Sequence, residues 1–235
     1  MNDRHLFLLI GQSNMAGRGE MNCVPPIVDD RIQMFRNKRW QKAIEPLHDD
    51  RLDLAGVGLA MSFADELLKA FPSVTIGLIP CAVGFTAIEQ WMPGSALYQR
   101  ALATVRESCE PHSKLRAILW HQGENDAREK SLAEQYRDRF VELVRALRKD
   151  LNAPDLPFIS GELGDFINAG IGYPYGREIS GVFRELETTL PYYACVSADG
   201  LTATADGLHF NAPSLREFGM RYALAYQDLL SRHGT

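Results

Sequence analysis

Two groups of polar residues near opposite ends of the chain have the residue types of a nucleophile and its base. Ser13 follows an apolar run over residues 6–10, and His209 follows Asp206 by three positions. A serine hydroxyl beside a histidine that a carboxylate orients can perform acyl transfer through a covalent intermediate. Each feature also has a plain structural explanation, because serine is a common helix cap and an Asp-x-x-His pair can be an ordinary surface hydrogen bond.

Two further segments contain groups that could stabilise the oxyanion of such a reaction. Gln122 lies within residues 121–126, directly after another apolar run. A side-chain amide at a strand end can donate to a developing negative charge. Gly84 lies in a segment that also follows an apolar run, and a glycine there lets a ligand approach a backbone N–H closely. Both groups are therefore candidate donors.

Glu124 leaves two alternatives open. It is a second candidate for the acid that orients His209, although Asp206 is favoured because a local turn can place it beside the imidazole. Glu124 could also join His121 as a metal ligand, but the remaining histidines and cysteines show no matching spacing and an HExxH motif is absent. We therefore expect no metal.

These residues must be positioned by a regular framework, and the apolar pattern predicts one. Apolar runs of strand length occupy residues 6–10, 74–79, 115–120, 157–160 and 192–196. Most of them lack alternation, which is typical of parallel strands covered by helices on both faces. Helical stripes lie between or after them, at residues 60–71, 132–151 and 215–229. The alternation predicts a three-layer α/β/α sandwich around a five-stranded parallel sheet.

Two long segments fit neither period. Residues 18–56 contain several prolines and charges, with a predicted hairpin around Arg36, Asn37 and Lys38, and residues 161–176 are rich in glycine. Loops of this length inside a compact domain are usually functional.

Composition narrows the possible partners. The 235 residues are 46% hydrophobic, which is enough for a sizeable core, and we expect a single domain over residues 1–235. A formal charge of −5 argues against a nucleic-acid or anionic-membrane surface. The four cysteines form no CxxC pair, so neither a zinc site nor a disulfide framework is predicted. Nothing in the sequence indicates an oligomeric state.

The first apolar run is shorter than a signal-peptide core, so we expect a cytoplasmic protein, although a signal removed before expression would leave the same sequence.

Taken together, the motifs resemble the SGNH hydrolase superfamily, and within it the branch of sialate O-acetylesterases and acetylxylan esterases of carbohydrate esterase family 6. The similarity rests on GQSNMAG at residues 11–17, the Gly84 segment, WHQGEND at 120–126 and DGLHF at 206–210. It implies a flavodoxin-like parallel sheet, no cofactor, and hydrolysis of acetyl esters on small-molecule or oligosaccharide sugars. Another SGNH activity on lipids or thioesters, or a non-catalytic carbohydrate-binding protein on the same fold, is the alternative.

Carried over to this chain, the resemblance implies Ser13 as the nucleophile, His209 as the general base and Asp206 as the orienting acid. The backbone N–H groups of Ser13 and Gly84, with the side chain of Gln122, would form the oxyanion hole.

Two aromatic residues are candidate substrate contacts. Related sequences often have Gly-Gly where this chain has Gly84-Phe85, so Phe85 is predicted to fill one wall of a narrow acyl pocket. Trp91 lies in a predicted loop near the same edge, where its indole could stack on a sugar. Packing in the core is the alternative for Trp91.

Overall fold

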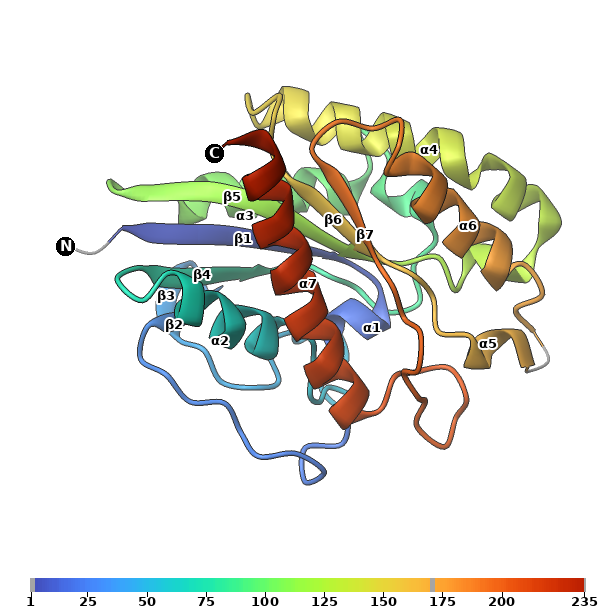
Figure 1. Ribbon diagram of the computed structural model, residues 1–235, viewed down its shortest axis with the longest axis horizontal. Coiled ribbons are helices and arrows are strands. Elements are labelled where there is room, and N and C mark those ends of the chain that lie inside the picture. The colour runs from blue at the N-terminus through green and yellow to red at the C-terminus, as the bar shows by residue number, and fades with distance from the viewer. Residues whose placement is uncertain (1–2, 170–171, 235) are drawn as a thin grey trace.

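A central sheet between two helical layers organises the molecule (Figure 1). The computed structural model describes residues 3–169 and 172–234. Among these residues the sheet has seven strands in the order β3-β2-β4-β1-β5-β6-β7. In chain order the strands are β1 Arg4–Gly11, β2 Ile32–Arg36, β3 Arg39–Lys42, β4 Thr75–Pro80, β5 Ser113–His121, β6 Phe158–Gly161 and β7 Tyr193–Val196. Neighbouring strands are parallel except in the β2–β3 hairpin.

The predicted strand count is wrong by two. All five predicted runs form strands, β1, β4, β5, β6 and β7, but the segment 18–56 supplies β2 and β3 as well. The predicted hairpin is confirmed, with Asn37 and Lys38 at φ 54° and 57° in a two-residue turn. The additional strands form because β2 pairs with β4 and buries Ile32 and Met34 in the core.

Strand β1 shows why the apolar runs lack alternation. Phe7 and Leu9 pack into the core on one side of the sheet, while Leu6, Leu8 and Ile10 pack into the core on the other. None of these side chains is more than 1% exposed. Both faces of the central strand are therefore buried, as expected for a parallel sheet between helices.

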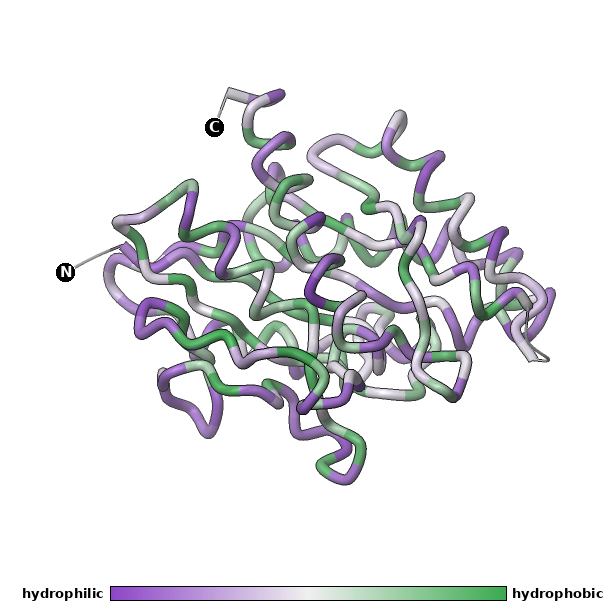
Figure 2. The backbone as a smooth tube through the Cα atoms, turned by 60° about the horizontal axis from the view of Figure 1, so that its bottom comes forward, coloured by the Kyte–Doolittle hydropathy of each residue, from purple (hydrophilic) through white to green (hydrophobic). Residues whose placement is uncertain are grey.

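The helices divide between the two faces of the sheet. One core contains residues of α1 Ser13–Ala16, α2 Ala60–Ala70 and α7 Ala212–His233. The other contains residues of α3 Ala96–Ser108, α4 Lys130–Asp150 and α6 Gly176–Leu186. Short elements complete the chain: α5 Phe166–Ala169 and the 3₁₀ turns Ile88–Trp91 and Asp126–Arg128. Figure 2 shows hydrophobic stretches running through the middle of the molecule, with hydrophilic ones around them.

Helix α7 is defined at both ends by its sequence. The Asn211 side chain accepts a hydrogen bond from the Ser214 N–H at 3.0 Å, and Pro213 occupies the first turn. Gly234 follows the last turn in the left-handed conformation. These signals fix where the chain enters α7, directly after the segment that contains His209.

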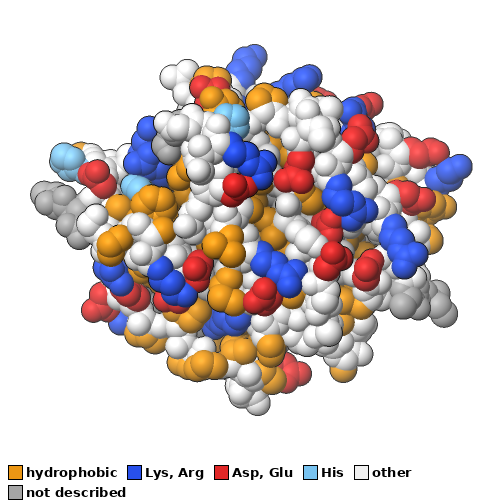
Figure 3. All heavy atoms as spheres, in the orientation of Figure 1, with side chains coloured by type: hydrophobic (Ala, Val, Ile, Leu, Met, Phe, Trp, Pro, Cys, Tyr) orange, Lys and Arg blue, Asp and Glu red, His pale blue; other side chains and the backbone are white. Residues whose placement is uncertain are grey.

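The surface exposes hydrophobic side chains as well as charged ones (Figure 3). Over the face seen in Figure 3, basic and acidic side chains lie interspersed rather than in blocks of one sign. Within residues 3–169 and 172–234, no helix is long and apolar enough to cross a membrane.

Candidate active site

Helix α1 follows β1 directly at the carboxyl edge of the sheet (Figure 1), and Ser13 is its first residue. Gly11 has φ 128°, and a Cβ there would lie 2.1 Å from the His121 carbonyl oxygen, so only glycine fits where β1 and β5 end together. Gln12 then caps α1, and Ser13 is its first residue. Ser13 is therefore not the helix cap, and its side chain is available for other contacts.

The structure brings Ser13, His209 and Asp206 into one hydrogen-bonded line. His209 Nε2 lies 2.9 Å from Ser13 Oγ, and His209 Nδ1 lies 2.6 Å from Asp206 Oδ2. This is the geometry in which an imidazole can take the serine proton while a carboxylate fixes its tautomer. Ser13 and His209 are 196 positions apart, so the fold alone creates the contact.

Asp206 is itself held in place by three donors. Its Oδ1 accepts hydrogen bonds from the Thr204 hydroxyl at 2.7 Å, the Leu208 N–H at 2.8 Å and the His209 N–H at 2.9 Å. Burial opposes ionisation of this carboxyl, but these donors and the His209 ring outweigh it and hold the pKa of Asp206 well below its ordinary range. Asp206 is consequently an anion when the imidazole becomes positive.

Glu124 contacts Asn14 and His121 but does not contact His209. Its Oε1 accepts from Asn14 Nδ2 at 2.5 Å and lies 3.4 Å from His121 Nε2. Burial opposes its ionisation, but His121 and Asn14 hold the pKa of Glu124 below its usual value. The structure thus places Asp206, and not Glu124, against the imidazole.

Asn14 is a site residue that the sequence reasoning missed. Its Nδ2 contacts Glu124 and lies 3.3 Å from the Leu208 carbonyl oxygen, while its Oδ1 accepts from the Phe210 N–H at 3.0 Å. One buried amide therefore holds the residues on both sides of His209. The signal was available, since Asn14 is part of the GQSNMAG motif.

Two of the three predicted oxyanion donors already have partners. The Gly84 N–H donates to Asp50 Oδ2 at 2.7 Å, and Arg18 Nη2 donates to the same oxygen at 2.7 Å. Burial opposes ionisation, but the Gly84 N–H and Arg18 lower the pKa of Asp50. Neither Arg18 nor Asp50 was a predicted site residue. The Ser13 N–H, by contrast, has no hydrogen-bond partner in the described part of the chain.

Gln122 is turned inward in this structure. Its side chain is 0% exposed, and its Nε2 lies 2.5 Å from Asp126 Oδ2, 2.9 Å from the Thr86 carbonyl oxygen and 3.2 Å from Gln12 Oε1. Burial raises the pKa of Asp126 to about 6. The structure brings Gln122 close to the nucleophile turn, but it does not present the amide hydrogens of Gln122 to a substrate.

The prediction that Trp91 contacts substrate is wrong, and its packing alternative is correct. Trp91 is 1% exposed, donates through Nε1 to Thr86 Oγ1 at 3.0 Å, and packs edge-on against Trp120 at 5.8 Å between ring centroids. The apolar body of an indole is stabilised by burial once its N–H has a partner.

Phe85 lies at the surface, directly after Gly84. It is 73% exposed with φ 62°, and the Arg128 guanidinium lies 5.9 Å from its ring centroid. A ring this exposed does not fill the wall of a closed acyl pocket, so that part of the prediction is wrong. The ring can still contact a sugar that lies over the site.

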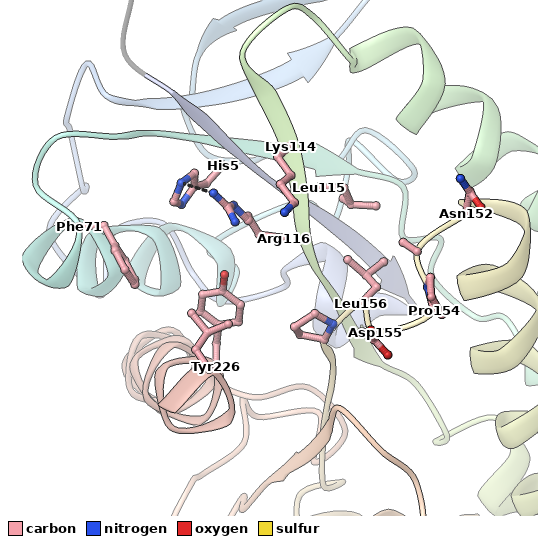
Figure 4. A pocket seen from close by; sticks show the side chains of 13 residues that line it. His5, Phe71, Lys114, Leu115, Arg116, Asn152, Pro154, Asp155, Leu156 and Tyr226 are labelled. Atoms are coloured by element: carbon pink, nitrogen blue, oxygen red, sulfur yellow. Dashed lines mark hydrogen bonds between the residues drawn. The ribbon is translucent and has the colours of Figure 1, made fainter. Parts of the chain in front are cut away.

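A separate cavity lies at the opposite edge of the sheet (Figure 4). It encloses about 530 Å³, and its walls include the first residues of β1 and β5. His5 and Arg116 point toward each other there, with 3.1 Å between Nε2 and Nη2, and burial lowers the pKa of His5 to about 4. In this cavity the histidine contacts a guanidinium, whereas at the carboxyl edge His209 contacts a serine hydroxyl.

A mostly parallel sheet with a serine, a histidine and an aspartate in one hydrogen-bonded line at its carboxyl edge is the arrangement of a carboxylic ester hydrolase, the class to which the comparisons with known proteins also assign the chain. The chain belongs to the carbohydrate esterase family described as sialic acid-specific acetylesterase, whose sequence pattern matches residues 3–228.

Sequence and structure similarity to a known relative support membership of this family. A probable carbohydrate esterase from Arabidopsis thaliana is 36% identical over 242 residues, which cover 94% of this chain and 89% of the relative. The X-ray structure of the Arabidopsis protein superposes with a TM-score of 0.86 at 34% identity, covering 97% of this chain and 99% of that one.

Two more distant structures share the fold. NanS superposes with a TM-score of 0.81 at 18% identity, covering 99% of each chain. A carbohydrate acetylesterase from Xanthomonas citri gives 0.72 at 21% identity, covering 97% of this chain and 57% of that one.

Proposed function

We propose that the protein removes O-acetyl groups from carbohydrates through Ser13, His209 and Asp206 and an acetyl-enzyme. The observation that supports this most directly is the position of His209, whose two ring nitrogens contact Ser13 Oγ and Asp206 Oδ2 at 2.9 and 2.6 Å. Membership of a family described as sialic acid-specific acetylesterase supports acetylated sugars as the substrate class. O-Acetylated sialic acids are the first substrates to test and acetylated xylan fragments the second.

The reaction follows from these contacts. His209 Nε2 takes the proton of Ser13 Oγ as that oxygen attacks the acetyl carbonyl carbon, and the carbonyl oxygen becomes an oxyanion. The tetrahedral intermediate collapses, the bond to the sugar oxygen breaks, and the proton on His209 passes to that oxygen. Water then attacks the acetyl-Ser13 ester in the same way and releases acetate. Asp206 keeps the His209 proton on Nδ1 throughout.

Replacing Ser13 by alanine tests the proposal. In a comparable serine hydrolase, loss of the nucleophile lowers kcat by about 10⁶. We expect a similar collapse for p-nitrophenyl acetate and for an acetylated sugar, with an unchanged melting temperature. Ser131→Ala is the matched control, because Ser131 is exposed on α4. Full activity in purified Ser13→Ala would overturn the assignment.

The acyl-chain preference separates the proposed activity from its rivals. Acetate, butyrate and octanoate esters of p-nitrophenol are compared with acetylated sialic acid and acetylated xylo-oligosaccharides. A preference for acetyl esters and release of acetate from a sugar support the proposal. Preference for the octanoate ester would indicate a lipid hydrolase, and sugar binding without turnover would indicate a binding protein.

A further inference from the structure

Arg116 brings a positive charge into the cavity at the amino edge of the sheet (Figure 4). Among residues 3–169 and 172–234 its side chain has one hydrogen-bonding partner, His5, whose Nε2 lies 3.1 Å from Arg116 Nη2. Because a guanidinium can only donate, Nε2 accepts, and His5 is neutral, as its lowered pKa also requires. The Arg116 Nε has no partner in the same residues. The guanidinium therefore keeps a charge for which the described protein supplies no ion-pairing carboxylate.

An irregularity in β5 produces this placement. Leu6 of β1 pairs with Leu115, and the next residue, Phe7, pairs with Ala117, so Arg116 is an extra residue that β1 does not match. A bulge of this kind redirects a side chain, and bulges are frequent next to functional sites. Strand β5 is therefore irregular at the residue that brings the guanidinium into the cavity.

Tyr226 of α7 adds a buried hydroxyl beside this charge. The residue is 2% exposed, and its ring packs edge-on against Phe7 with 5.4 Å between centroids. Burial raises the pKa of Tyr226 to about 12, and the Arg116 charge opposes this rise. The hydroxyl forms no hydrogen bond with residues 3–169 or 172–234, and Figure 4 shows it pointing toward Arg116. Buried tyrosine hydroxyls usually have a partner, so a partner for this one has to come from the cavity.

Apolar side chains form walls on either side of these polar groups. Phe71 follows α2, Leu230 lies near the end of α7, and Pro157 directly precedes β6. All three are partly buried, so each keeps apolar surface open to the cavity. The cavity encloses about 530 Å³, within the range of about 300 to 1,000 Å³ that is typical of small-molecule sites. A ligand there meets apolar surface as well as the guanidinium.

The charges around the cavity favour a monoanion. Lys114 is exposed at its rim and adds a second positive charge, whereas Asp155 is the one acidic side chain among the described residues that line it. Figure 4 shows Asp155 on the far side of the cavity from His5 and Arg116. A carboxylate matches the planar guanidinium and carries a single charge. A phosphate would instead bring about two charges into the space that Asp155 faces.

We propose that this cavity binds a small monocarboxylate with an apolar body. The carboxylate accepts hydrogen bonds from the Arg116 Nη groups and from the Tyr226 hydroxyl, and the body lies against the apolar walls. Strand β1 begins at this cavity and ends before Ser13, so the two sites lie at opposite edges of the sheet. The proposal goes beyond the esterase function and does not depend on it.

The first test measures the binding of 4-phenylbutyrate to the full chain by isothermal titration calorimetry at neutral pH. We expect one molecule to bind per chain. Butyrate has the charge without the aromatic body, and 4-phenylbutan-1-ol has the body without the charge, so each should bind at least about tenfold more weakly. Inorganic phosphate should also bind more weakly. Equal affinity for the alcohol, or tighter binding of phosphate, would overturn the assigned ligand class.

Two substitutions test the polar contacts. Arg116→Met should weaken the binding of 4-phenylbutyrate by about tenfold or more, since it removes charge-assisted hydrogen bonds. Tyr226→Phe should weaken it several-fold while the melting temperature of the ligand-free protein stays unchanged, because the hydroxyl has no partner in the described chain to lose. A hydroxyl with a purely structural role would change the melting temperature and leave the affinity unchanged. Arg128→Met is the matched control with native binding, because Arg128 is exposed beside Phe85 at the other edge of the sheet.

A further variant keeps the test decisive if Arg116→Met does not fold. Ala153→Phe fills the cavity from its wall and should abolish binding. Native affinity in the folded cavity variants, loss of affinity in Arg128→Met alone, or no binding to the native protein at millimolar probe would each overturn the proposal. A dimer that the probe dissociates would make a second copy of the chain the occupant and overturn it as well. Ser13→Ala should bind the probe with native affinity, so activity that persists in Ser13→Ala refutes the esterase mechanism only, and absent probe binding refutes this site only.

Discussion

Replacing Asp206 by asparagine should give the histidine the wrong tautomer without changing the shape of the site. Oδ1 of Asp206 accepts from the Thr204 hydroxyl and from the N–H groups of Leu208 and His209. An amide turned with its NH₂ toward them would lose three hydrogen bonds worth about 0.5 to 1.5 kcal/mol each. The new amide therefore keeps its oxygen there and points its NH₂ at His209 Nδ1. That nitrogen must then accept, which puts the ring proton on Nε2, the atom that faces Ser13 Oγ.

The size of the loss follows from the exposure of the pair. A buried acid changed in this way costs about 10⁴ in kcat in a serine protease. The Asp206 side chain is 49% exposed, so water competes with the amide for the imidazole, and we expect a loss of about 10² to 10³. Initial rates with p-nitrophenyl acetate at neutral pH measure it, with thermal unfolding followed alongside.

Glu124→Gln is the matched charge-removing control. Glu124 contacts Asn14 and His121 but not His209, so this variant should retain most of its kcat and lose mainly stability. Near-native kcat in a folded Asp206→Asn protein, beside a severe loss in a stable Glu124→Gln protein, would refute the reasoning.

Three other changes have distinct expected outcomes. Trp91→Phe removes the hydrogen bond to Thr86 Oγ1 and should lower the free energy of unfolding by about 1 kcal/mol in urea titrations. The KM for an acetylated sugar should not change. A raised KM at native stability would instead indicate that Trp91 contacts the substrate. Phe85→Ala should raise KM for the sugar several-fold at constant kcat and melting temperature, and an unchanged KM would remove Phe85 from the binding surface. Asp50→Ala leaves Arg18 buried without its partner and should cost about 3 to 5 kcal/mol in the same titrations. The folded-state pKa of Asp50 lies below its unfolded value, so the stabilisation from this carboxylate is complete at neutral pH and is lost as the pH falls below about 4. Below that pH the free energy of unfolding of the native protein should therefore fall more steeply than that of Asp50→Ala. Parallel pH profiles for the two proteins would contradict this.

The sequence was most informative where one strand or one turn decides the outcome. The five apolar runs form strands because a parallel strand between helices is buried on both faces, and an unbroken run of apolar residues is what such burial requires. Asp206 and His209 are three positions apart, so their contact depends on a single turn. Strand β2 was missed because its five residues include Gln33 and Arg36, and only its pairing with β4 makes it part of the sheet.

Contacts between distant loops could not be predicted. Asp50 lies 34 positions before Gly84, and nothing in either segment indicates that the carboxylate binds that N–H. The inward turn of Gln122 depends on Thr86 and Asp126, which lie on different segments. For Trp91, the burial that decides between stacking on a sugar and packing is a property of the finished fold.

The separation of Ser13 and His209 along the chain has a consequence for biosynthesis. During synthesis Ser13 is added 196 positions before His209, which lies just before α7. Because amino-terminal parts of a chain emerge and begin to fold first, the proposed mechanism predicts no ester hydrolysis by the growing polypeptide until the segment before α7 has been made and α7 packs against α2. The onset of ester hydrolysis during translation would then report when the fold is complete. Loss of activity when a protease removes α7 would show that this helix is required.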